Sequence, residues 1–320
     1  MGSKFSRRRF VAGVGVVAAA SALPRRALAL AEPIYPPMDL SYFDTPIRPA
    51  PGQFRLGYAA ITWEGKDRQA IEDIAALGFR GIQLRSPAIK EFRSPAELRD
   101  LLLRRHLTFV ALSGGNVRLD PAVEAEDLAK HLANAKFLRD AGGLYLQVTD
   151  QRPKDRPVTS EDFKRLGRLL TEIGKRSADL GVPLGYHNHM GSLGERPEEV
   201  DRIMDASDPN LVRLELDIAH YVQGGGDPVK AIERYRDRLL FLHIKDVETL
   251  TGNPKPKPYR FVELGRGRVD LPAVFAALER AKFRGWSVVE LDTVPESSRT
   301  PKESAMISKE FLEKKLGLKV

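Results

Sequence analysis

Cysteine is absent from this chain of 320 residues. Its absence excludes disulfide bonds, a lipid-modified cysteine, a thiolate metal site and a cysteine nucleophile. Any metal ligands must therefore be histidine or carboxylate side chains. Histidine is also scarce, with 6 copies in the whole chain, so the positions of the histidines carry information about function.

The chain has little net charge once its first segment is set aside. The formal net charge is +8, but six basic residues and no acidic residue precede Glu32, which leaves +2 for the rest. A nearly balanced chain has no electrostatic footprint for nucleic acid or for an anionic membrane surface. We therefore expect no nucleic-acid partner and no membrane anchor.

A long hydrophobic run is also missing, and the apolar run near the amino terminus is short. Val11 to Leu23 follows a twin-arginine pair within Ser6 to Phe10 and precedes the small-x-small site Ala29 to Ala31. A spanning helix needs about 20 strongly apolar residues, whereas this order of features is typical of a leader for the twin-arginine (Tat) export machinery. Residues 1–31 are therefore predicted to be a removable leader, and the mature protein to be periplasmic or secreted. A basic disordered amino terminus is the alternative.

Strand and helix patterns alternate along the chain after a Pro-rich stretch. Residues 32–53 contain six prolines and are predicted to be an extended segment. From residue 54 to 320, eight strand patterns alternate with eight helix patterns, which predicts a single (β/α)8 TIM barrel of the α/β class. The expected strands are Leu56–Ile61, Gly81–Arg85, Thr108–Leu112, Leu144–Thr149, Val182–His189, Leu211–His220, Leu239–Asp246 and Trp286–Asp292. The expected helices are Asp67–Leu77, Ser94–Arg105, Pro121–Ala141, Ser160–Leu180, Arg196–Ala206, Asp227–Arg236, Leu271–Ala281 and Pro301–Leu316.

A doubly wound open sheet is the competing fold. It usually has fewer strands, and the chain lacks a Gly-rich fingerprint after its first strand that would mark a dinucleotide site. In the predicted barrel, the active site lies at the C-terminal ends of the strands.

Ligand-type residues close the last four strand patterns. Successive strand side chains point to opposite faces, so the ligand-type residues of each run share one face. These pairs are His187 and His189, Glu215 and Asp217, His243 and Lys245, and Glu290 and Asp292. Four parallel strands that bring histidine, aspartate and glutamate to one mouth predict a metal site with nitrogen and oxygen ligands.

The motifs around these residues, taken in order, resemble the xylose isomerase-like barrel superfamily. YHNHMG, LDIAH, GGDP, HIKD and GRGRVDLPAVF follow one another between residues 186 and 275, and the likeness covers Phe54 to Leu291. It is nearest to the inosose dehydratase and sugar phosphate isomerase-epimerase group. The resemblance implies one divalent metal ion bound by His187, Asp217, His243 and Glu290.

His187 departs from the pattern of many relatives, which have glutamate there in a Glu-Asn-His run. Two carboxylates and two imidazoles neutralise a divalent ion, and the added nitrogen shifts the preference from Mg²⁺ toward Mn²⁺, Co²⁺, Fe²⁺ or Zn²⁺. His189 lies two residues further out on the same face. Either histidine therefore fits as the ligand from the fifth strand, while the other does acid-base work.

The expected chemistry is proton abstraction next to a carbonyl. The ion polarises a carbonyl or a vicinal hydroxyl pair of a sugar or cyclitol, and a base removes the alpha proton. Reprotonation gives isomerisation or epimerisation, whereas loss of the β-substituent gives dehydration or elimination; export favours an unphosphorylated keto-sugar or keto-glycoside. His189 and His220 are predicted to be base and acid, with Lys245 as donor to the developing oxyanion. His220 also fits a group that supports the ligands, or an additional ligand.

Several further features leave alternatives open. Glu215 and Asp246 are predicted to be partners of buried Lys or Arg. The aromatic residues Tyr58, Trp63 and Tyr186, near strand ends, fit either a wall for a sugar ring or barrel packing.

Two other classes compete with the enzyme: a non-catalytic periplasmic sugar-binding barrel, and a phosphodiesterase of the endonuclease IV kind, which uses several metals and more histidines. The sequence also leaves open whether the chain forms a homo-oligomer.

Overall fold

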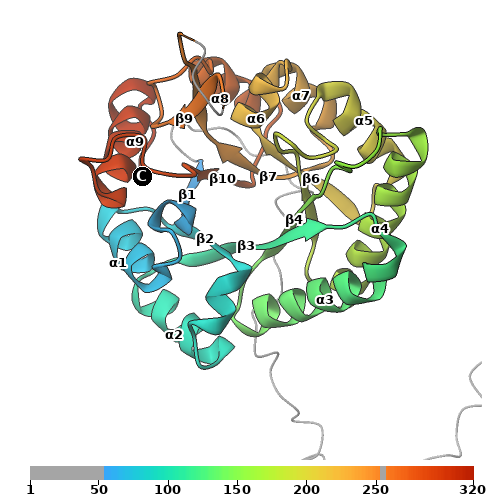
Figure 1. The fold of residues 1–320 in the computed structure, drawn as a ribbon. Helices are drawn as coiled ribbons and strands as arrows, with labels where there is room; N and C mark the ends of the chain where they lie inside the picture. The colour runs from blue at the N-terminus through green and yellow to red at the C-terminus, as the bar shows by residue number, and fades with distance from the viewer. Residues whose placement is uncertain (1–53, 253–256) are drawn as a thin grey trace, which may run out of the picture. The chain divides into compact units, whose positions relative to one another are not determined.

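The computed structural model describes residues 54–252 and 257–320. The predicted leader (1–31) and Pro-rich segment (32–53) lie outside the described residues and stay predictions. Across the described residues, eight parallel strands close into a barrel, and Figure 1 shows the helices arranged around it. In hydrogen-bonded order around the ring, the strands are β1 (Arg55–Ala59), β10 (Trp286–Val289), β7 (Leu239–Ile244), β6 (Val212–Asp217), β5 (Leu184–His187), β4 (Tyr145–Asp150), β3 (Thr108–Val117) and β2 (Gly81–Arg85). The predicted TIM barrel is confirmed.

The helices begin where the sequence provides caps. Ser94 accepts the N–H of Glu97 before the second helix, and Thr300 and Glu303 form a capping box before the last one. No helix in the described ranges is long and apolar enough to cross a membrane. The helices are α1 (Asp67–Leu77), α2 (Pro95–Arg104), α3 (Glu124–Asp140), α4 (Ser160–Ala178), α5 (Pro197–Ala206), α6 (Ile218–Gln223), α7 (Pro228–Tyr235), α8 (Leu271–Arg280) and α9 (Pro301–Leu316).

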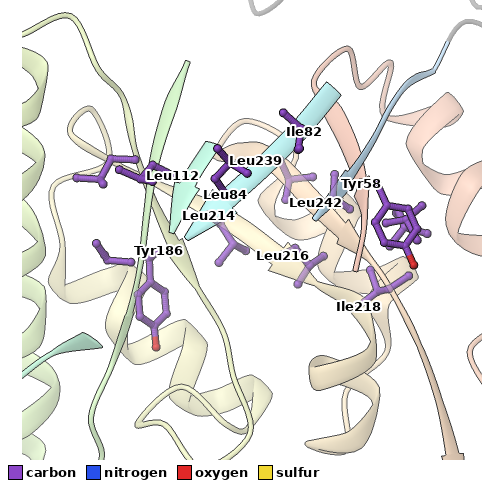
Figure 2. Close-up of a cluster of buried hydrophobic side chains, with 14 of the residues drawn as sticks. Tyr58, Ile82, Leu84, Leu112, Tyr186, Leu214, Leu216, Ile218, Leu239 and Leu242 are labelled. Atoms are coloured by element: carbon purple, nitrogen blue, oxygen red, sulfur yellow. The ribbon is translucent and has the colours of Figure 1, made fainter. Parts of the chain in front are cut away.

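Apolar side chains fill two regions. The larger cluster includes side chains on the outer face of the strands and residues of the surrounding helices, and Figure 2 shows part of it, including Leu214 and Leu216 of β6. In the smaller cluster, Tyr145 and Phe241 stack with their ring centroids 5.6 Å apart. Phe241 lies two residues before His243 on β7, so both point to the same face, one layer apart. An apolar floor therefore lies beneath the polar residues at the mouth of the barrel.

The chain departs from the predicted alternation at two places. The run read as a strand up to His220 ends at Asp217, because Asp217 caps a new helix, α6. A two-stranded antiparallel hairpin, β8 (Asp246–Thr249) and β9 (Tyr259–Val262), interrupts the connection from β7 to α8. A short apolar run fits a strand and a buried helical turn equally well, so its periodicity did not separate the two.

Candidate metal centre

The four predicted ligands meet at the C-terminal ends of four strands. His187 ends β5, Asp217 ends β6, His243 lies near the end of β7, and Glu290 directly follows β10. One ligand atom from each side chain lies within 4.8 Å of the others, and all four side chains are buried. The structure thus brings these residues together, while their binding of a metal ion stays a prediction.

The cluster contains buried polar atoms that make no hydrogen bond of normal geometry within the described residues and face other ligand-type atoms at close range instead. They include Nδ1 of His187, Oδ2 of Asp217 and Nδ1 of His243. Nδ1 of His243 lies 3.1 Å from Oε2 of Glu290 and 3.6 Å from Oδ2 of Asp217. An unpaired buried polar group costs about 1–3 kcal/mol. A cation at this place would satisfy these atoms together, so the residues fit a divalent ion.

The buried carboxylates of the cluster also favour a cation beside them. Burial opposes a charged imidazole, but the carboxylates of Glu215 and Glu290 raise the pKa of His243 well above its ordinary range. Burial likewise opposes a charged Glu290, but His243 and Lys245 lower the pKa of Glu290 well below its ordinary range. The carboxylate therefore stays ionised beside a positive charge, which a proton on His243 supplies in the metal-free protein.

Glu215 is a further buried carboxylate of the cluster. It touches Nδ1 of His187 and lies 3.4 Å from Nδ1 of His243. Gly185 makes room for it, because a Cβ at Gly185 would crowd the Cβ of Glu215 at 3.3 Å. The prediction that Glu215 pairs with a buried Lys or Arg is wrong: among the described residues its partners are histidines, since His187 is its register partner on the adjacent strand β5.

Asp246, the other residue predicted to pair with Lys or Arg, instead fixes a loop. Its carboxylate accepts the N–H groups of Gly265, Gly267 and Val269 at 2.9–3.0 Å. Gly267 must lack a side chain, because a Cβ there would lie 2.2 Å from Oδ1 of Asp246. The prediction for Asp246 is therefore wrong, since backbone donors take up its charge.

Asp217 and Asn188 tie the ends of β5 and β6 together. Oδ1 of Asp217 accepts the N–H groups of Ala219 and His220 at 2.9 and 2.8 Å, so one oxygen caps α6 while Oδ2 faces the cluster. The side-chain amide of Asn188 accepts the N–H of Asp217 at 2.9 Å and donates to its carbonyl at 3.1 Å. The position of this ligand is therefore fixed from two strands.

The backbone of Met190 holds His189 and His220 in opposite tautomers. Nδ1 of His189 donates to the carbonyl of Met190 at 2.7 Å, which leaves a lone pair on Nε2. The N–H of Met190 donates to Nδ1 of His220 at 3.1 Å, which leaves the proton of that ring on Nε2. Burial lowers the pKa of His189 to about 4 and that of His220 well below its ordinary range. Both imidazoles are therefore neutral near pH 7.

Lys245 is fully buried beside the cluster. Its Nζ donates to Oε2 of Glu290 at 3.0 Å and to Asp292, and lies 3.3 Å from Nε2 of His220. Phe261 of β9 covers the ammonium, with its ring centroid 4.1 Å from Nζ. Burial lowers the pKa of Lys245, but Asp292 and Glu290 outweigh burial and raise it above its ordinary value. The lysine is therefore a permanent cation that balances the carboxylates.

A cavity of about 970 Å³ opens at the mouth of the barrel. His187, His189 and Glu290 lie in its wall, so the cluster is open to a ligand on this side. Its volume is at the upper end of the range of about 300–1,000 Å³ for small-molecule sites. Uncharged polar side chains that also line the cavity are Gln83, Ser113, Asn116, Gln147, Thr149, Gln151, Ser192 and Thr293. Such a wall suits a ligand rich in hydroxyl groups.

Some of the predicted residues lie away from this cavity. Neither His220 nor Lys245 is among the described residues that line the cavity. Tyr58, Trp63 and Tyr186 also stay clear of the described wall and belong to the larger apolar cluster, where Figure 2 shows Tyr58 and Tyr186. Of the two roles left open for these aromatic residues, the structure supports barrel packing.

Gln83 and Asn188 were missed by the sequence interpretation. Oε1 of Gln83 on β2 lies 2.8 Å from Nε2 of His243, although 160 residues separate them. Gln83 lies two residues before Arg85 on β2, so both side chains point to the same face, and this alternation was the available signal. The alternation does not show which residue of another strand Gln83 contacts. Asn188 stands between two histidines in the YHNHMG motif, and the interpretation of the sequence gave roles to the histidines and none to Asn188.

The chain belongs to the family of xylose isomerase-like TIM barrels, whose model matches residues 71–315. It is similar to the inosose dehydratase of Lacticaseibacillus casei, with 27% identity over 295 residues that cover 82% of this chain and 97% of the relative. It is also similar to the inosose dehydratase of Geobacillus kaustophilus, with 28% identity over 294 residues that cover 82% and 94%. Among solved structures, it resembles the IOLI protein with a bound zinc atom (TM-score 0.71, 20% identity, 82% and 98% covered) and a D-allulose 3-epimerase from Methylomonas sp. (TM-score 0.66, 21% identity, 82% and 98% covered). These structural likenesses show a shared fold.

Proposed function

We propose that this protein is a divalent-metal-dependent enzyme that moves the proton next to a carbonyl of a sugar or cyclitol. The observation that carries the proposal is the set of buried ligand-type atoms that lie within 4.8 Å of one another without hydrogen bonds of normal geometry in the described chain, next to a polar cavity. The names of similar proteins, inosose dehydratase and D-allulose 3-epimerase, support a sugar-like substrate. The zinc atom in the IOLI structure supports a divalent ion.

His187, Asp217, His243 and Glu290 would hold the ion. Two imidazoles and two carboxylates favour Mn²⁺, Co²⁺, Fe²⁺ or Zn²⁺ over Mg²⁺, because imidazole nitrogen is a softer ligand than carboxylate oxygen. When bound, such an ion supplies Lewis-acid polarisation of a carbonyl or a pair of hydroxyl groups.

His189 fits the role of base. It lines the cavity, and the bond from its Nδ1 to Met190 leaves the lone pair on Nε2, where the alpha proton is received. His220 lies against His189, with ring centroids 3.9 Å apart and ring planes tilted by 40°. Because His220 is not among the described residues that line the cavity, its position favours holding His189 in place over direct proton transfer to a substrate. Lys245 keeps Glu290 ionised. Its full burial favours this role over direct contact with a substrate oxyanion.

Two outcomes follow from the loss of the alpha proton. Return of the proton at the same or the neighbouring carbon gives epimerisation or isomerisation, and departure of the β-substituent gives dehydration or elimination. A cavity of about 970 Å³ has room for a keto-glycoside as well as for a single keto-sugar.

Two other classes are less well supported. In a sugar-binding barrel without catalysis, a neutral imidazole at the cavity wall would serve as a hydrogen-bond acceptor for a hydroxyl group, so it is the buried set of Asp217, His243 and Glu290 that disfavours this class. A phosphodiesterase of the endonuclease IV kind needs several metal ions. His187, His189 and His220 could form a second site, but the ammonium of Lys245 lies 3.3 Å from Nε2 of His220 and disfavours another cation there.

The test is proton exchange in deuterated water. Zn²⁺- or Mn²⁺-loaded protein is incubated with a panel of keto-sugars and keto-glycosides, and deuterium at the alpha carbon is followed by NMR. We expect exchange with the wild type and none after the metal is removed with a chelator. Metal-loaded protein that binds these compounds without exchanging their alpha protons would favour the sugar-binding barrel.

We also propose that the twin-arginine export machinery carries the chain to the periplasm or the medium, on the pattern in residues 1–31. Replacing Arg7 and Arg8 together by lysine should retain the uncleaved protein in the cytoplasm, as cell fractionation would show. Unchanged export of this variant would contradict the proposal.

A further inference from the structure

Gln83 contacts one of the candidate ligands from another strand of the barrel. Its Oε1 lies 2.8 Å from Nε2 of His243, and the two side chains are 3% and 1% exposed. An amide oxygen only accepts hydrogen bonds, so Nε2 of His243 carries a proton. Nδ1 is then the atom that faces the carboxylates of Glu290 and Asp217, at 3.1 and 3.6 Å.

Gln147 contacts the Gln83 amide in an arrangement that matches this orientation. Nε2 of Gln83 donates to Oε1 of Gln147 at 3.4 Å, and both side chains are buried. Turning over the Gln83 amide alone would place two carbonyl oxygens against each other and an NH₂ group on His243. Gln147 and Gln83 both line the cavity, so a chain of contacts runs from the cavity wall to the ligand.

We propose that Gln83 is a positioning residue that keeps the proton of His243 on Nε2 and thereby reserves Nδ1 for the metal ion. The proposal rests on the proposed function, because it takes the cluster to hold an ion. A group that accepts the second N–H of a ligating histidine fixes the ring and makes it a stronger ligand. Loss of such a group typically weakens metal binding about 10- to 100-fold.

The first test uses the wild-type protein loaded with Zn²⁺ and labelled with ¹⁵N histidine. Two-bond ¹H–¹⁵N correlations assign the protonated nitrogen of each ring, and we expect Nε2 to be protonated in His243. Tight zinc binding with the proton on Nδ1 of His243 would overturn this inference alone. Absence of zinc binding would overturn it together with the proposed function.

The second test compares zinc affinities, measured by competition with a chelator. Gln83→Leu removes the acceptor at similar size and should bind zinc about 10- to 100-fold more weakly, whereas Gln83→Glu keeps an acceptor and should bind at least as tightly as the wild type. Wild-type affinity in Gln83→Leu would overturn the proposal. If that variant does not fold, the nitrogen assignment of the wild type decides.

A charge-matched control is needed because Gln83→Glu also adds a negative charge near the ion. Gln83→Leu combined with Gln147→Glu adds the charge next door but no acceptor for Nε2 of His243. We expect this double variant to bind zinc as weakly as Gln83→Leu. Recovery to the affinity of Gln83→Glu would show that charge, and not the acceptor, controls binding, and would overturn the proposal.

Discussion

Asp217 accepts the backbone N–H of His220 at 2.8 Å with Oδ1, while its Oδ2 lies in the buried cluster, 3.6 Å from Nδ1 of His243. One carboxylate thus caps α6 and contributes to the candidate ligand set. Because His220 lies in the first turn of α6, Asp217 also positions the imidazole of His220, which packs against His189. The two roles can be separated by the choice of substitution.

Asp217→Asn is expected to keep the helix cap and lose the metal, because its amide oxygen still accepts N–H groups but carries no charge. Asp217→Ala should lose the metal and also cost about 1 kcal/mol of unfolding free energy for the missing cap. Elemental analysis after metal loading and denaturant unfolding of the metal-free proteins measure the two effects. Full metal occupancy in Asp217→Asn would remove this residue from the ligand set.

His187→Glu is expected to retain a metal ion while shifting the preference toward Mg²⁺, because a carboxylate oxygen replaces an imidazole nitrogen. The ratio of Zn²⁺ to Mg²⁺ affinities, measured by competition titration, should fall. His189→Ala is the matched control and should bind zinc normally. If His189→Ala loses zinc while His187→Ala does not, His189 is the ligand from this part of the chain.

His189→Gln is expected to keep metal and substrate affinity but to exchange the alpha proton about 10²- to 10⁴-fold more slowly, since it has lost the basic Nε2. Rates of deuterium incorporation and KM should be measured with the same keto-sugar and the same metal content. An exchange rate equal to that of the wild type would exclude His189 as the base.

The barrel could be predicted because each of its units carries local signals. Ser94 caps α2, and Gly78 ends α1 with the positive φ of 95° that the sequence pattern anticipates at a helix end. The start of α6 could not be predicted in this way, because Ile218 and Ala219 are as compatible with a strand as with a buried turn of helix. The β8–β9 hairpin depends on contacts with the barrel mouth, such as Phe261 against Lys245.

Strand parity anticipated which ligand-type side chains share a face, and the structure brings His187, Asp217 and His243 into one cluster. Parity alone does not say which residues of different strands touch. The contact of Gln83 on β2 with His243 on β7 arises only when the barrel closes. That of Glu215 with His187 depends on the register between the adjacent strands β5 and β6. For the same reason, the sequence did not distinguish Lys245, which is buried, from a residue in the cavity wall.

Lys245→Met is expected to lower the unfolding free energy of the metal-free protein by about 3–5 kcal/mol. The substitution keeps the apolar length of the side chain but leaves the buried carboxylate of Glu290 and the half-buried carboxylate of Asp292 without their common cation. Denaturant unfolding in the presence of a chelator measures the loss, and the exposed Lys154→Met is a control that should change little. A loss below about 1 kcal/mol would mean that the lysine does not balance this cluster.

His131 should make the stability of the barrel depend on pH. It is fully buried in α3, neither of its ring nitrogens makes a hydrogen bond of normal geometry in the described part of the chain, and burial lowers its pKa to about 4. In the unfolded chain this pKa is about 6.5, so between these two values the unfolded state binds more protons than the folded state. Stability should therefore fall as the pH drops from about 6.5 to about 4, by up to about 3 kcal/mol.

Denaturant unfolding at several pH values in this window tests the effect of His131. The variant His131→Leu should reduce the dependence of unfolding free energy on pH by up to about 1.4 kcal/mol per pH unit, because the titrating group is gone. His106→Asn is the matched control: His106 is exposed and has a positive φ of 53°, which asparagine tolerates. Equal slopes for the wild type and His131→Leu would mean that His131 titrates alike in the folded and unfolded chain, contrary to its burial.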